Sequence, residues 1–172
     1  MDASRLPDRA QPPAKRPVDH HLRARPRPKV HPHGSQSVSY REVMSQLVVN
    51  SAMMQCAMGL APGTLTVLPI SRIVAGGQPV ANILDSKPFV NITGFGMCMS
   101  LANPTVAAAT AAAFGALVPM PCTPMTTAPW VPGSPTVMSG PAPALTSTCQ
   151  CICAFGGVIQ ITMPGQFTAL AP

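Results

Sequence analysis

RIVAGGQPVANIL at residues 72–84 and TVMSGPAPAL at residues 136–145 share the same spacing of a β-prone residue, glycine and proline. This shared spacing is the clearest indication of the fold. In each stretch a β-prone residue, Ile73 or Val137, is followed three positions later by glycine and six positions later by proline. The spacing predicts a strand, a glycine turn and a second strand that begins at proline. Two such hairpin units indicate pseudo-symmetry about an axis, and chance repetition in a chain rich in proline and glycine is the alternative.

Short apolar runs bounded by turn residues recur along the chain and predict a mainly β fold of short strands and hairpins. We expect strands at residues 47–49, 64–68, 72–75, 80–84, 89–92, 136–138 and 158–163. A second repeat supports this pattern, because CAMG at residues 56–59 is echoed by CAFG at residues 153–156. Between Pro119 and Pro143, eight prolines in 25 residues exclude a regular helix or a central strand.

Composition separates the chain into two segments. Only 9% of the 172 residues are charged and 4% are aromatic, while 22 are prolines and 13 are glycines, which is unlike an average globular enzyme or a helical bundle. Residues 1–40 contain eight of the eleven Lys and Arg residues and all four histidines, whereas residues 88–172 contain no charged side chain. We therefore divide the chain into a tail, residues 1–40, and a domain, residues 41–172.

The tail carries a local charge of +5 and few aliphatic residues, so it cannot bury enough apolar area to offset the entropy of ordering. We predict that it is disordered. It has no apolar run of the length that a secretory signal needs, so we expect the protein to be made in the cytoplasm. A nucleic-acid-associated protein acting through this tail is the alternative function, although no aromatic residue before Tyr40 could stack on bases.

The most apolar segment is TVAAATAAAFGALV at residues 105–118, between Pro104 and Pro119. Asn103 and Pro104 match an N-cap and a first-turn residue, and the alanine content favours helix. About 15 residues extend roughly 22 Å as a helix, less than the ~30 Å hydrocarbon core of a bilayer. We expect one short helix that does not span a membrane and that packs against apolar surfaces on more than one side.

The domain lacks the groups that common catalytic sites use. Glu42 and Asp85 are its only carboxylate side chains, and it has no histidine to activate a serine or cysteine nucleophile. Phosphate-binding glycine motifs are also missing from the sequence. We therefore expect a protein that is not an enzyme.

A series of short motifs in fixed order resembles the PAAR-like proteins formerly catalogued as a domain of unknown function. These are tip proteins of bacterial contractile injection machines such as the type VI secretion system. The resemblance covers roughly residues 43–163 and excludes the tail. The motifs that carry it are VVNSA (48–52), Cys56, LTVLP (65–69), GQPVANI (77–83), DSKP (85–88), FGMC (95–98), NPT (103–105), PMPC (119–122), PW (129–130), PGSPTV (132–137) and CAFGGVI (153–159).

The resemblance implies a small β cone whose broad base sits on a trimeric spike protein, often called VgrG, and whose point leads the spike into a target membrane. It implies a structural tip that docks as one copy and not as a homo-oligomer. An effector or adaptor and a transient membrane contact are the further partners implied. The protein would leave the producing cell with the spike. A neutral surface suits such a part, because desolvating charges is costly.

The domain holds all six cysteines, and a reducing compartment favours free thiols or metal over disulfides. PAAR domains proper carry a zinc site built mostly from histidines, but this domain has none, so a bound metal would need an all-cysteine shell. Our candidate ligands for a structural zinc ion are Cys56, Cys98, Cys122 and Cys153. These four lie in segments that carry the resemblance, and each adjoins a glycine or proline turn.

The remaining cysteines belong to an alternating run, Cys149, Cys151 and Cys153. On a strand these three sulfur atoms would share one face at intervals of about 6.6 Å, so they could not all reach one ion without bending. Cys149 and Cys151 are therefore spares, a disulfide pair or buried packing residues. Packing without any metal is the alternative for all six.

Overall fold

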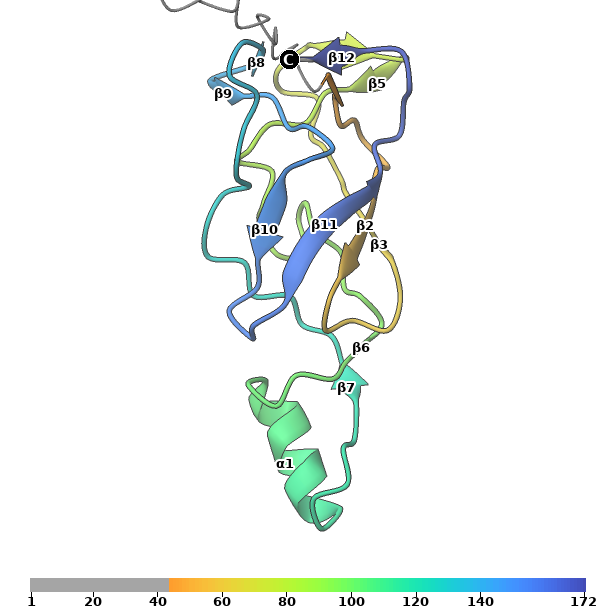
Figure 1. Cartoon of the computed structure of the whole chain (residues 1–172), viewed down its shortest axis with the longest axis vertical. Helices are drawn as coiled ribbons and strands as arrows, with labels where there is room; N and C mark the ends of the chain where they lie inside the picture. Colours follow the sequence, from red (N-terminus) through yellow and green to blue (C-terminus); the bar gives the residue numbers. More distant parts are fainter. Residues whose placement is uncertain (1–43) are drawn as a thin grey trace, which may run out of the picture. The chain divides into compact units, whose positions relative to one another are not determined.

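The computed structural model describes residues 44–172, which form a mainly β domain with one short helix, as predicted (Figure 1). The predicted disordered tail lies outside the described residues. Proline and glycine interrupt the apolar runs, so most strands are short. The elements are β1 (Ser45–Gln46), β2 (Met53–Cys56), β3 (Gly63–Thr64), β4 (Val74–Ala75), β5 (Gln78–Pro79), β6 (Met97–Cys98), α1 (Pro104–Ala112), β7 (Met120–Pro121), β8 (Met138–Ser139), β9 (Ala142–Pro143), β10 (Gln150–Ile152), β11 (Val158–Met163) and β12 (Leu170–Ala171).

Two β hairpins confirm the repeat seen in the sequence. β4 pairs with β5, and β8 pairs with β9, both antiparallel and in the same register. Gly76 and Gly140 occupy equivalent turn positions with φ of 57° and 66°, a left-handed conformation that glycine adopts without steric cost. The second strand of each hairpin ends at the proline, whereas the sequence analysis expected it to begin there, because Pro79 and Pro143 pair with the first residue of the strand before the turn. The shared glycine and proline spacing still specifies one local structure.

A third unit of the same design is formed by segments from the two ends of the described chain. β1 pairs with β12 so that Gln46 faces Leu170, just as Pro79 faces Val74 in the β4–β5 hairpin. The two strands are far apart in sequence, with 126 positions separating Ser45 from Ala171. No turn joins them, and the sequence analysis did not find this unit. We call the three units the arms.

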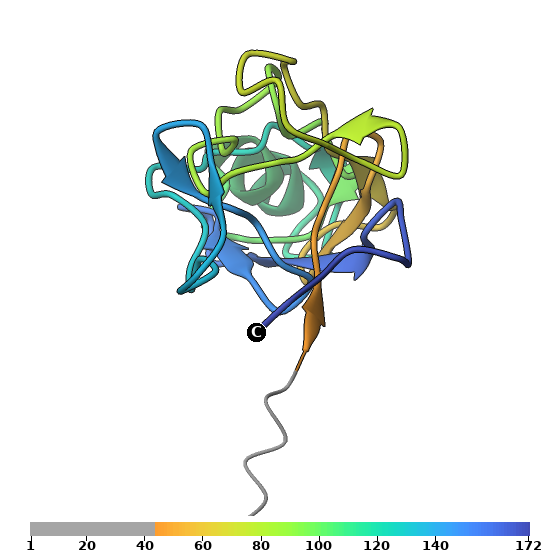
Figure 2. The ribbon, with the colours of Figure 1, turned by 90° about the horizontal axis from the view of Figure 1, so that it is seen from above.

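A closed ring of backbone hydrogen bonds joins the three arms. The amide of Val48 donates to the carbonyl of Leu145, that of Leu145 to Ala81, and that of Ala81 to Val48, all at 2.9 Å. A second set repeats the ring two residues along each segment: Asn50 donates to Pro79 at 2.9 Å, Ile83 to Pro143 at 3.1 Å and Ser147 to Gln46 at 2.9 Å. The arms are therefore related by a pseudo-threefold axis, and Figure 2 shows them arranged around it.

We call this region the threefold base, residues 45–50, 73–83, 137–147 and 169–171. Its segments bury Leu47, Val49, Val80, Ala144 and Ala171 in one cluster. Between the base and the opposite end of the domain lies a four-stranded sheet in the order β10-β11-β2-β3 (Figure 1). The main core packs there, with Trp130, Phe95, Met54, Leu65, Ile92 and Ile159 as its largest fully buried side chains.

The second region is a single excursion of the chain at the other end of the domain, residues 97–122, which we call the distal hairpin (Figure 1). β6 and β7 pair antiparallel at its neck, and α1 lies between them in sequence. The helix begins as predicted, because the Asn103 side chain accepts from the Thr105 amide at 3.1 Å and Pro104 occupies the first turn. Among the described residues, no helix has the length and apolarity needed to cross a membrane.

Two expectations about this helix are wrong. It ends at Ala112 rather than near Val118, because Phe114 and Gly115 adopt left-handed φ of 55° and 89° and the Gly115 amide turns back to the Thr110 carbonyl at 2.9 Å. It also packs on one side only, since Val106 and Thr110 are its only buried residues. The returning chain covers this side, where the Val118 amide donates to Thr110 Oγ1 at 3.2 Å.

Candidate functional site

The threefold base presents one apolar side chain from the same position of each arm. Val74, Met138 and Leu170 are equivalent, because each faces the equivalent residue of its partner strand, Pro79, Pro143 or Gln46. They are 65%, 52% and 46% exposed. Side chains of this kind usually avoid water, so three equivalent exposed ones indicate an interaction surface.

Hydrogen bonds fix the backbone that carries these three side chains. Each arm is fixed to the ring by a further hydrogen bond: Val80 donates to Ile73 at 2.9 Å, Ala144 to Val137 at 2.8 Å and Leu47 to Ala169 at 3.0 Å. The ring and these bonds satisfy the backbone groups of the buried segments. The three apolar positions are therefore held in one fixed arrangement around the axis.

A second site lies at the neck of the distal hairpin, where the four predicted ligand cysteines come together. Cys98 lies in β6 and bridges to Gly59, and the Cys122 amide donates to the Gly96 carbonyl at 2.7 Å just after β7. Cys56 ends β2, and the Cys153 amide donates to the Gly157 carbonyl at 2.8 Å just after β10. The cluster thus joins the hairpin to the central sheet.

Glycine makes room for this thiol cluster. A Cβ at Gly157 would lie 2.5 Å from the Cys56 sulfur and 3.7 Å from the Cys153 Cβ. The space that a larger residue would fill is therefore occupied by the Cys56 thiol. Sequence reasoning found the four cysteines but did not identify Gly157 as the residue that lets two of them approach.

Burial makes two thiols of this cluster, Cys56 and Cys122, harder to ionise. Burial raises the pKa of Cys56 above its ordinary value, and neighbouring charge on Cys153, Cys122 and Cys98 would raise this pKa further, against one backbone hydrogen bond at Met58. Burial likewise raises the pKa of Cys122, with added contributions from Cys98 and Cys153. All four are free thiols. A cation placed among them would favour the thiolate forms and so lower these pKa values.

The sulfur atoms do not yet form a ligand shell. Across residues 44–172, no three His, Cys, Asp or Glu side chains are arranged to hold a metal ion as they stand. Ligation would require the thiols to turn toward a common point. The structure therefore brings the predicted residues near one another, while metal binding stays a prediction.

Cys149 and Cys151 are buried free thiols outside this cluster. The three cysteines of the alternating run share the buried face of the chain around β10, as predicted. The Cys149 thiol donates to the Pro132 carbonyl, and that of Cys151 donates to the Ala128 carbonyl at 3.6 Å. Burial raises the pKa of Cys151 to about 11. Both therefore serve as packing residues in this structure.

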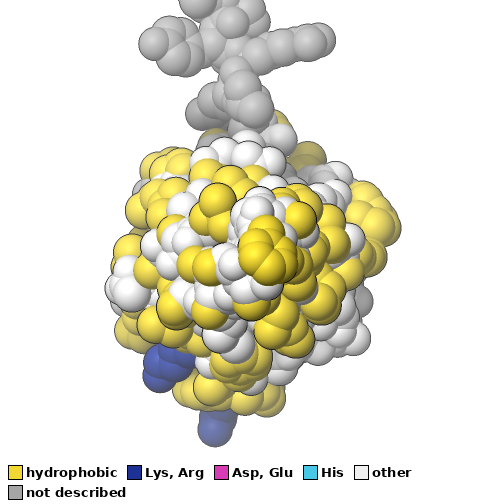
Figure 3. Space-filling model, turned by 90° about the horizontal axis from the view of Figure 1, so that it is seen from below, with side chains coloured by type: hydrophobic (Ala, Val, Ile, Leu, Met, Phe, Trp, Pro, Cys, Tyr) yellow, Lys and Arg dark blue, Asp and Glu magenta, His cyan; other side chains and the backbone are white. Residues whose placement is uncertain are grey.

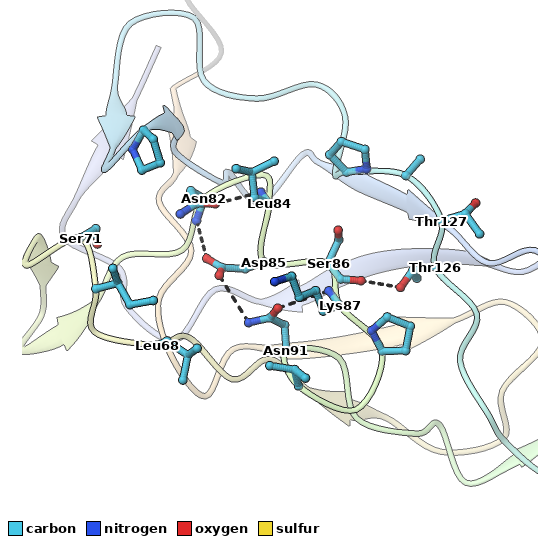
Figure 4. A pocket seen from close by; sticks show the side chains of 16 residues that line it. Leu68, Ser71, Asn82, Leu84, Asp85, Ser86, Lys87, Asn91, Thr126 and Thr127 are labelled. Carbon is cyan, nitrogen blue, oxygen red and sulfur yellow. Dashed lines mark hydrogen bonds between the residues drawn. The ribbon is translucent and has the colours of Figure 1, made fainter.

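A groove of about 550 Å³ lies on the side of the domain and contains Asp85 and Lys87 (Figure 4). The Asp85 carboxylate already accepts from the Asn82 amide at 2.9 Å and from Asn91 Nδ2 at 3.3 Å. Burial raises the pKa of Asp85, while the Asn82 hydrogen bond and nearby Lys87 lower it in part. This carboxylate holds two loops together, because both of its oxygen atoms are used within the protein.

Comparison with known proteins gives one match. A family model described as a domain of unknown function (DUF4280) matches residues 48–166. This range includes two complete arms, the four clustered cysteines and the distal hairpin. No curated protein and no solved structure matches the chain significantly.

Proposed function

The chain belongs to the family of the domain of unknown function DUF4280, and we propose that it is a non-enzymatic, PAAR-like tip protein that caps the trimeric spike of a contractile injection machine. One observation carries the proposal: a single chain closes a ring of three equivalent arms through three equal hydrogen bonds. Most oligomers have closed rotational symmetry, and a threefold end presents the same surface three times. One copy of this chain can meet all three subunits with equivalent contacts.

The surface chemistry of the base supports this docking. Val74, Met138 and Leu170 each expose a large apolar side chain at the equivalent position of an arm. Charge plays little part, because Arg72, Asp85 and Lys87 are the only Lys, Arg, Asp or Glu residues among residues 44–172. Apolar anchors at the centre of an interface commonly carry most of its binding energy. The proposed interface is therefore apolar and repeated three times.

The decisive experiment measures binding to purified trimeric spike proteins by native mass spectrometry and biolayer interferometry. We expect one copy of this chain per trimer. Val74→Asp, Met138→Asp and Leu170→Asp should each weaken binding about tenfold or more, since each places a charge in an apolar contact. Leu117→Asp in the distal hairpin is the matched control and should bind normally, because it also adds one charge at an exposed leucine.

Unequal effects would refute the threefold proposal. If only one of the three arm variants weakens binding, the partner uses one face of the domain and not its pseudo-symmetry. A stable homo-oligomer with no affinity for any spike trimer would also contradict it. Under the proposal, the protein is made in the cytoplasm and leaves with the spike, and an effector or adaptor is a further partner.

We also propose that Cys56, Cys98, Cys122 and Cys153 hold a structural zinc ion. Support comes from their convergence at one neck and from Gly157, where a Cβ would collide with the Cys56 sulfur. Zinc with four thiolate ligands is a closed structural site that crosslinks the segments supplying the ligands. Here it would tie the distal hairpin to the central sheet.

A further inference from the structure

The distal hairpin has an unusual surface for a helix exposed to water. A helix with apolar residues all round is normally buried, yet most sides of α1 are exposed. Its exposed residues are mainly alanine, and Leu101, Phe114 and Leu117 add large apolar side chains. No residue from Pro88 to Pro172 is charged. Figure 3 views this end and shows hydrophobic and uncharged groups across it, with basic side chains only at the rim.

The polar groups of the hairpin are largely satisfied internally. Thr105 Oγ1 donates to the Asn103 side chain at 2.8 Å, and Thr110 Oγ1 accepts from the Val118 amide at 3.2 Å. At the far end of the helix, the carbonyls of Thr110, Ala111 and Ala113 accept from the amides of Gly115, Phe114 and Ala116 at 2.9, 3.2 and 3.1 Å. The Asn103 Nδ2 atom lacks a partner but is buried within the protein. Internal bonding of this kind is what hydrocarbon requires of a polypeptide.

Phe114 occupies the far end of α1 in a conformation that does not suit it. Its φ of 55° is left-handed, which is strained for a bulky residue and easy for glycine or asparagine. Its side chain is fully exposed, so neither packing nor burial explains it. A large apolar side chain held in water on a strained backbone is a signal of function outside the free protein.

From these observations we propose that the distal hairpin inserts into the hydrocarbon of one lipid leaflet, with Phe114 leading. This inference rests on the proposed function, because it names the partner of the end that a docked base leaves free. The nine residues of α1 extend about 14 Å, which is about half of the ~30 Å hydrocarbon core. The hairpin is thus long enough to enter one leaflet and too short to cross both. The absence of charge favours lipid over a polar protein surface, since nothing has to be neutralised on entry.

The test uses the full chain and vesicles of pure phosphatidylcholine at about 0.5 M salt, so that the basic tail is screened. Trp130 is fully buried and gives a constant background. Phe114→Trp should shift its fluorescence to the blue on vesicle addition and be quenched by brominated lipid. Phe167→Trp is the matched control at another exposed phenylalanine, outside the hairpin, and should show neither change.

Charge at the same two positions gives an independent readout by vesicle flotation. Phe114→Asp should lower vesicle binding about tenfold or more, while Phe167→Asp should bind like the parent protein. Aspartate adopts left-handed φ more readily than phenylalanine, so Phe114→Asp should fold. Spike docking is measured on the same variants, so loss of one activity with retention of the other shows which of the two proposals fails.

Three results would overturn the inference. The first is recovery of the parent protein entirely apart from vesicles at all lipid concentrations. The second is equal quenching of both tryptophan variants, which would place contact elsewhere. A reversible dimer that Phe114→Asp abolishes would assign the hairpin to a second copy of the chain.

Discussion

The threefold base and the distal hairpin are built in opposite ways. In the base, segments up to 126 positions apart pair in three equivalent arms around one axis. The hairpin is one continuous stretch whose hydrogen bonds are mostly local. It occurs once in the described domain and is not repeated around the axis. The base buries a cluster of aliphatic residues at its centre, whereas none of the alanines of the hairpin is fully buried.

This difference means that the stability of the fold depends mainly on the base, while the exposed apolar surface of the hairpin can vary independently. Long-range pairing and buried side chains make the base part of the cooperative unit, so substitutions there should act on the whole fold. The hairpin contributes one buried stripe and can change its surface with little effect on folding. The proposed function would need these two properties in different places, and the thiol cluster lies where the two regions join.

The largest expected effect tests that junction. If zinc crosslinks the neck, it can contribute on the order of 10 kcal/mol to folding, and a chelator should lower the melting temperature strongly. Protein purified under reducing conditions should contain one zinc per chain by mass spectrometry. Cys56→Ser and Cys153→Ser should lose the metal. Cys149→Ser should keep it, because that thiol lies outside the cluster; substoichiometric metal in the parent protein would leave the cysteines as packing residues.

The next effect compares a buried leucine of the base with an exposed leucine of the hairpin. Leu145 belongs to the base by its backbone, and its side chain is fully buried in the main core. Leu145→Ala should therefore reduce the free energy of unfolding by about 3 kcal/mol through lost transfer energy and a residual cavity. Leu117→Ala, at an exposed leucine of the hairpin, should change it by less than about 0.5 kcal/mol. Chemical denaturation measures both. Similar losses at the two sites would show that the hairpin is also part of the cooperative core.

The parts of the base that could be predicted from the sequence are those with a local sequence pattern. Gly76 and Gly140, each three residues before a proline, specify the β4–β5 and β8–β9 hairpins. Both hairpins were predicted, although their second strands end at the proline instead of beginning there. The third arm has no such pattern, because β1 and β12 meet only in the folded chain and no turn joins them. The ring could not be predicted either, since backbone hydrogen bonds place no demand on residue type.

The helix and the thiols show the same limit. Asn103 and Pro104 mark the start of α1 correctly, but its end was misplaced because Phe114, and not glycine, takes the first left-handed position. The expected packing on several sides failed because apolar composition predicts burial and does not say against what. The four candidate cysteines lie near one another in the fold, but their ligation depends on side-chain orientation, which the sequence does not determine.

A smaller effect is expected where the sheet meets the thiol cluster. In Gly157→Ala the new methyl group would lie 2.5 Å from the Cys56 sulfur, so one of them must move. Overpacking of this kind costs about 1–2 kcal/mol. Thermal melting should show the loss, and metal analysis should show reduced zinc if Cys56 is a ligand. A stable variant with unchanged metal content would mean that the cluster is loosely packed and that Cys56 is free to turn away.

The smallest effect has the opposite sign and lies at the end of the hairpin. Phe114 holds a φ of 55° with its side chain fully exposed, so it contributes strain and no packing to the folded state. Phe114→Gly removes the strain, although glycine loses more entropy on folding, and the net gain in stability should be about 0.5–1 kcal/mol. Denaturant unfolding resolves a change of this size when the slope of the transition is unchanged. The same substitution should weaken vesicle binding, because the leading apolar side chain is gone. A variant that is more stable and binds lipid less would show that Phe114 is retained for contact outside the fold; a variant that is less stable would show that its side chain supports the hairpin after all.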